Sequence, residues 1–96
     1  MIAFTVWDDL QMARDRIVVG AIEGDETVRP VARRLRDEGH EVVFVGGHQT
    51  PEQLVATAVA EDACRIVAAA DDEAWAALSA LAAALDGGGL PIDRAM

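Results

Sequence analysis

The sequence contains no lysine, no tyrosine and no asparagine, and it has a single cysteine. Without lysine or tyrosine, a mechanism through a Schiff base or a phenolic acid is excluded. The lone Cys64 excludes an internal disulfide, and the first residues lack the basic segment and cleavage site of a signal peptide. We therefore expect a cytoplasmic protein in a reducing compartment.

Positive charge is also scarce, because eight arginines face seventeen acidic side chains and leave a formal net charge of −9. Such a chain repels the phosphates of nucleic acids and of anionic lipids, so no nucleic acid and no membrane is expected as a partner. Although 52% of the residues are hydrophobic, no apolar run approaches the roughly 18 residues of a membrane span. With 96 residues, the chain has room for one globular domain.

Short apolar runs rich in β-branched residues predict three buried strands, and each is followed by apolar residues at helical spacing. The first helix is expected to begin after Thr27, because this start places Pro30 in the first turn, and to end near Gly39. That start leaves an irregular loop directly after the first strand. The predicted strands are residues 16–22, 41–45 and 63–69.

The second and third helices have clearer starts. The string Thr50-Pro51-Glu52-Gln53 supplies an N-cap, a first-turn proline and a capping-box glutamine. A third helix follows at residues 72–85, with acidic residues at its positively polarised start. The alternation of strands and helices requires crossover connections, which predict an α/β fold with a parallel sheet covered by helices on both faces.

The two ends of the sequence suggest how the sheet is completed. Residues 1–15 are expected to form an N-terminal arm or edge strand with a linker, because apolar residues alternate at period two in the first seven positions. Residues 16–96 then form the domain itself. Residues 90–92 are too few for another full strand and helix, so the edge of the third strand, at residues 65–69, is expected to be unpaired. An unpaired edge favours a homodimer or a partner protein.

Two tryptophans, Trp7 and Trp75, are the candidate interface anchors for such a contact, since buried aromatic side chains contribute much of the energy of interfaces.

Three strings, RIVVG at residues 16–20, LRDEG at 35–39 and GGHQTPEQ at 46–53, resemble the cobalamin-binding domain of methylmalonyl-CoA-mutase-like enzymes. The resemblance covers about residues 16–85. It implies a flavodoxin-like (Rossmann-like) sheet in which the first strand lies between the second and the third. Compared with that family, we expect a domain truncated to about three core strands plus a possible N-terminal edge strand.

The sequence departs from that family where the family holds its cofactor. The resemblance implies an Asp-x-His-x-x-Gly loop after the first strand, whose histidine ligates cobalt, but residues 23–30 contain no histidine. A Ser-x-Leu string is expected after the third strand, where Ala68-Ala69-Ala70 stands. A later Gly-Gly pair has no counterpart. We therefore expect the fold without the cofactor, so the predicted cofactor is none.

Chemistry-bearing residues follow the predicted strands at the edge where open α/β sheets bind ligands. Glu23 and Asp25 follow the first strand, His48 follows the second, and Asp71 with Asp72 follows the third. His48 is the candidate general acid or base, assisted by the two acids of the first loop. The competing interpretation is that His48 supports the next helix cap and that the acids are ordinary loop and cap residues.

No histidine or cysteine pair has the spacing of a metal site, so no metal is expected. Arg29, Arg33 and Arg36 recur at i, i+4 and i+7 on the first helix. This stripe is either a solvated face paired with neighbouring acids or a surface for an acidic partner.

Two classes of function follow. The first is a cofactor-free relative of the cobalamin domain that acts as a partner-binding protein or small subunit. The second is a small cofactor-independent enzyme. It would bind a small molecule in the crevice at the carboxyl edge of the sheet, where the family holds its cofactor, and His48 would act as acid or base. A cobalamin-binding mutase small subunit is a further alternative.

Overall fold

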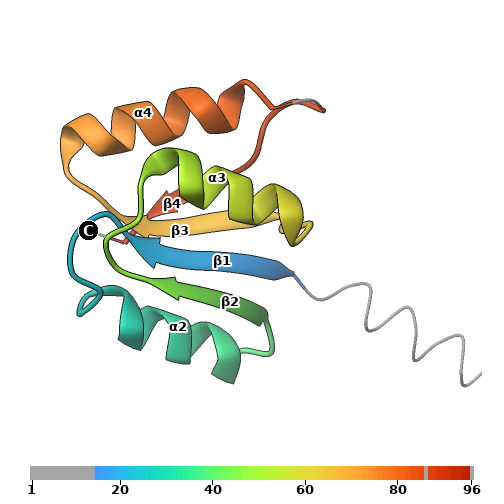
Figure 1. Cartoon of the computed structure of the whole chain (residues 1–96). Coiled ribbons are helices and arrows are strands. Elements are labelled where there is room, and N and C mark those ends of the chain that lie inside the picture. Colours follow the sequence, from blue (N-terminus) through green and yellow to red (C-terminus); the bar gives the residue numbers. More distant parts are fainter. Residues whose placement is uncertain (1–14, 86, 96) are drawn as a thin grey trace, which may run out of the picture.

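The computed structural model describes residues 15–85 and 87–95, which form a four-stranded sheet with helices on both sides (Figure 1). The strands lie in the order β2-β1-β3-β4, and all neighbouring strands are parallel. The predicted α/β, flavodoxin-like fold is thereby confirmed, including the first strand between the second and the third. The strands are β1 (Arg16–Ala21), β2 (Glu41–Gly46), β3 (Arg65–Ala69) and β4 (Ile92–Arg94). The helices are α2 (Val28–Asp37), α3 (Pro51–Ala60) and α4 (Asp72–Ala83).

Strand β1 occupies the centre of the sheet, because it pairs with β2 on one side and with β3 on the other. Its apolar side chains alternate between the two faces, as the period of a strand requires. Val18 belongs to the core beneath α3 and α4, whereas Ile17 and Val19 belong to the core beneath α2. All three are at most 1% exposed, so β1 contributes to both halves of the hydrophobic core.

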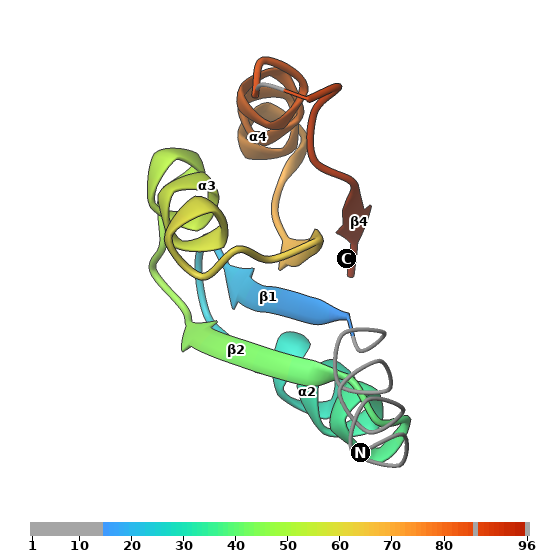
Figure 2. The same cartoon turned by 90° about the vertical axis from the view of Figure 1, so that its right-hand side faces the viewer.

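The helices form two layers, with α2 on one face of the sheet and α3 and α4 on the other (Figure 2). Leu54 of α3 and Leu78 of α4 are fully buried in one core, and Val28 of α2 is fully buried in the other. A hollow of about 430 Å³ lies beside α2, where β3 and β4 have no second helix over them among the described residues; Leu35 and Val67 are part of its lining.

The starts of the helices lie where the sequence predicted them. Thr27 is the N-cap of α2, although its side chain accepts no capping hydrogen bond. Thr50 forms a complete capping box with Gln53, whose backbone N–H lies 3.0 Å from the Thr50 hydroxyl oxygen. The carboxylate of Asp71 accepts a 2.8 Å hydrogen bond from the backbone N–H of Ala74 and caps α4.

The expectation that the outer edge of the third strand is unpaired was wrong. Strand β4 pairs along this edge, with Ile66 opposite Ile92 and Ala68 opposite Arg94. Three residues suffice because hydrogen bonds outside the strand extend the pairing: the Ile66 N–H donates to the Pro91 carbonyl, and the N–H of residue 95 donates to the carbonyl of Ala68. The C-terminal residues therefore fill the place for which an N-terminal arm was expected.

The N-terminal arm and Trp7 lie outside the described residues, so both stay predictions, as does a domain boundary at residue 15. Trp75 is half-buried and packs against the core beneath α3 and α4. The guanidinium of Arg94 lies 5.7 Å from the centroid of its ring. The role of Trp75 at an interface remains a prediction. Within the described residues, none of the helices is long and apolar enough to cross a membrane.

Candidate functional site

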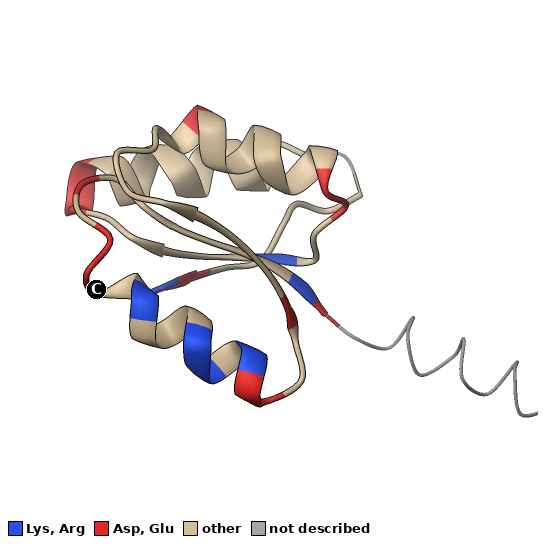
Figure 3. Ribbon diagram, turned by 60° about the horizontal axis from the view of Figure 1, so that its bottom comes forward, with Lys and Arg blue, Asp and Glu red and all other residues tan. Residues whose placement is uncertain are grey.

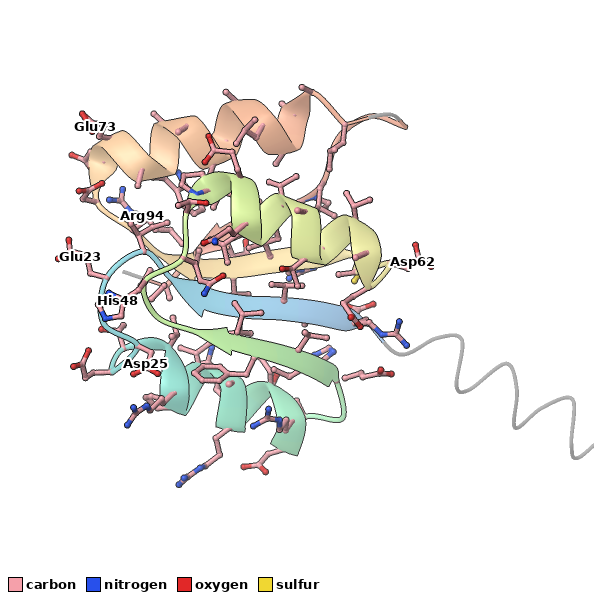
Figure 4. All side chains as sticks on the ribbon, viewed as in Figure 1. Glu23, Asp25, His48, Asp62, Glu73 and Arg94 are labelled. Atoms are coloured by element: carbon pink, nitrogen blue, oxygen red, sulfur yellow. The ribbon has the colours of Figure 1, made fainter. Side chains whose placement is uncertain are left out.

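The carboxyl ends of the strands meet at one edge of the sheet, because every strand is parallel to its neighbour. The loops after β1 and β2 bring Glu23, Asp25 and His48 to this edge, and Figure 4 shows the three residues there together with Arg94. The sequence-based placement of the three candidate catalytic residues at one edge agrees with this geometry. Their catalytic role remains a proposal.

The backbone of the β2–α3 loop lies directly on the β1–α2 loop. The N–H of His48 donates a 2.7 Å hydrogen bond to the carbonyl of Glu23, and the N–H of Gln49 donates a 3.0 Å bond to the carbonyl of Ala21. To make this turn the chain adopts positive φ at Gly46 (81°) and at His48 (58°). A side chain at Gly47 would overlap the Glu23 carbonyl oxygen, so only glycine permits the approach.

The side chains at this edge do not form a linked catalytic group in the described structure. Glu23 and His48 are exposed, and within residues 15–85 and 87–95 no hydrogen bond or ion pair joins the His48 imidazole to either acid. The Asp25 carboxylate instead pairs with the Arg29 guanidinium at 3.0 Å and is 21% exposed. The carbonyl of Asp25 also accepts hydrogen bonds from the N–H groups of the first turn of α2. Asp25 therefore anchors the start of a helix.

The loop after β3 is held by a residue that sequence reasoning did not single out. The Arg94 guanidinium donates a 2.8 Å hydrogen bond to the Ala70 carbonyl and pairs with the Asp72 carboxylate at 2.8 Å. Because β4 runs parallel to β3, its last residue reaches the end of its neighbour. Sequence reasoning could not find this role, because no local pattern distinguishes Arg94 from an ordinary surface arginine.

His40 and Cys64 lie away from this edge. His40 follows α2 at the opposite, amino-terminal edge, with its imidazole 4.0 Å from Asp15 and 3.8 Å from Glu38. Partial burial, and next the Asp15 carboxylate beside it, raises the pKa of the Cys64 thiol, so Cys64 stays protonated at neutral pH. Across the described residues, no group of three or more histidine, cysteine, aspartate or glutamate side chains is arranged to hold a metal ion.

Comparison with known proteins finds no matching family model. A 44-residue part of the chain is 50% identical to the 2-hydroxyisobutanoyl-CoA mutase small subunit of Aquincola tertiaricarbonis. That relative is a mutase subunit. The matched segment is 46% of this chain and 32% of the relative, so the match spans about a third of the relative's length. The chain is therefore similar to a mutase small subunit over this segment alone.

The contact between the first two loops can be tested by adding one methyl group. Gly47→Ala is expected to cost about 1 to 3 kcal/mol of unfolding free energy, because the new Cβ forces the β1–α2 backbone to move. Gly24→Ala is the matched control in the same loop pair, since the three atoms nearest to its Cβ all belong to the Glu26 side chain, which can rotate away. That control is expected to cost less than about 0.5 kcal/mol in chemical denaturation. Equal losses in the two variants would show that the Gly47 contact does not position the loop.

Proposed function

We propose that this chain is a small-subunit domain that binds a partner protein of a mutase-type enzyme and does not itself hold cobalamin. The observation that carries the subunit role is the 50% identity over 44 residues with a mutase small subunit. The flavodoxin-like order of the strands agrees with it. The fold and the matched segment thus favour a role in an assembly.

The residues at the carboxyl edge do not fit the cofactor that the resemblance implies. The loop from Glu23 to Thr27 offers no imidazole, and the exposed His48 is on the following loop. The two loops approach so closely that a Cβ at Gly47 finds no space, so their backbones leave no room for a ligand group at that point. After β3, the Ala70 carbonyl is already bonded to Arg94. These contacts support a cofactor-free subunit.

Cobalamin binding is measured by titrating the purified protein with hydroxocobalamin and recording its visible spectrum. We expect no change of the cobalt ligand, because the first loop has no histidine to bind it. His48→Ala serves as the companion variant, since its imidazole is the one exposed at this edge. A stoichiometric spectral shift at micromolar concentration that disappears in His48→Ala would contradict the cofactor-free interpretation.

The subunit role is tested on the full chain. The tagged protein is purified from the cell that makes it, co-eluting chains are identified, and the pair is reconstituted from separately purified proteins. We expect a stoichiometric complex with a mutase polypeptide, whose mass by light scattering differs from that of a homodimer of the 10.2 kDa chain. If the chain stays monomeric near millimolar concentration and no mutase polypeptide joins it, the subunit role is refuted.

A small enzyme is the second candidate, and the observation that favours it is that Glu23, Asp25 and His48 share the edge where α/β folds bind ligands. In this alternative His48 transfers the proton and the acids assist. Any turnover is expected to disappear in His48→Ala and to persist in His40→Ala, because His40 lies at the opposite edge. Equal loss in both variants at unchanged melting temperature would rule out this placement.

A further inference from the structure

Helix α2 concentrates positive charge in an acidic protein. Four of the eight arginines lie on this ten-residue helix, whereas the whole chain has a net charge of −9 (Figure 3). Arg29, Arg33 and Arg36 recur at i, i+4 and i+7, so their side chains share one face over about 10 Å of helix axis. We call these three residues the arginine face of α2.

The arginine face of α2 borders a hollow in the protein surface. A hollow of about 200 Å³ is lined by all three arginines of this face, by Ala32 and by Phe44. Phe44 lies on β2, an edge strand of the sheet, and is half-buried against the core beneath α2. Three arginines and two apolar residues thus line one hollow, and such a lining can bind carboxylates together with an apolar side chain.

Among the residues that the structure describes, acidic side chains neutralise only part of the charge of this face. Arg29 pairs with Asp25. Arg34, which is not part of the lining of this hollow, lies 3.9 Å from the Glu38 carboxylate. Arg33 and Arg36 are exposed and have no ion pair with any residue in the described ranges. The guanidinium groups of Arg33 and Arg36, which lie beside an apolar surface, can therefore form ion pairs with the carboxylates of a partner.

We propose that the arginine face of α2 docks an acidic helix of the partner protein, with carboxylates at i, i+4 and i+7 on Arg29, Arg33 and Arg36 and one apolar side chain on Phe44. The proposal rests on the subunit function argued above and names the surface that serves it. Charge complementarity selects this occupant, because the spacing of the arginines along α2 matches acidic side chains on one face of a second helix. The rest of this acidic chain would repel the same helix.

The probe is a synthetic helical peptide of about eighteen residues with Glu at i, i+4 and i+7 and Leu between them; the control peptide has Gln in place of Glu. Binding to the full chain is followed by NMR, using backbone amides and the Nε–H signals of the arginines. We expect shifts confined to α2 and Phe44, weaker binding at higher salt, and no shifts with the Gln peptide.

Two double variants with the same net charge separate a local surface from a general charge effect. Arg33→Gln with Arg36→Gln is expected to weaken binding about tenfold, as two partly exposed ion pairs are lost. Ala56→Glu with Ala60→Glu changes the net charge equally on exposed positions of α3 and is expected to keep the affinity within about twofold.

The proposal is overturned by equal weakening in both double variants, by shifts centred elsewhere, or by no shift at about millimolar peptide. Tighter binding of a single-stranded oligonucleotide of equal charge would overturn it as well. These outcomes are separate from the subunit role. A native partner that binds the Arg33→Gln, Arg36→Gln variant as tightly as the unchanged chain would leave that role intact and remove only the docking surface.

Discussion

The structure depends on the burial of β1 between two parallel neighbours. Strand β1 forms backbone hydrogen bonds with a parallel neighbour on each side, and its side chains are buried in both cores. Each connection between parallel strands must therefore cross over one face of the sheet, and a helix in that connection covers the face. The pairing continues past the end of the strand: the Ile22 N–H donates to the Ala69 carbonyl, and the carbonyls of Ala21 and Glu23 accept from the next loop. The ladder that forms the sheet therefore also closes its carboxyl edge.

The backbone contacts at the carboxyl edge agree with the proposal that this fold is kept here without a cofactor site. Glycine at position 47 lets the second loop lie on the first, and Arg94 ties the third loop to the last strand. Each contact uses backbone carbonyls that a ligand would otherwise find available. In the proposed account the partner-binding surface is the arginine face of α2, whose positive charge contrasts with the net charge of −9 of the whole chain.

Local signals made most of this fold predictable from the sequence. The three long strands follow β-branched runs, the Thr50 capping box fixes the start of α3, and the conflict of Pro30 with an earlier start fixes that of α2. Strand β4 could not be predicted, because its three residues pair only through the register that β3 provides. The position of Arg94 depends on the same register. That His48 and the acids of the first loop share an edge was predictable from strand polarity, whereas the positive φ of His48 and the Asp25–Arg29 pair needed the structure.

The closure of the carboxyl edge is the central claim, and hydrogen exchange at two backbone amides tests it most directly. The N–H groups of His48 and Gln49 are bonded to carbonyls of the β1 segment. Native-state exchange followed by NMR is expected to show these amides protected nearly as strongly as those of the β1–β2 ladder, because they open only when the edge opens. Exchange at the rate of an unstructured peptide, with the ladder still protected, would contradict the account, since the edge would then be open to a ligand.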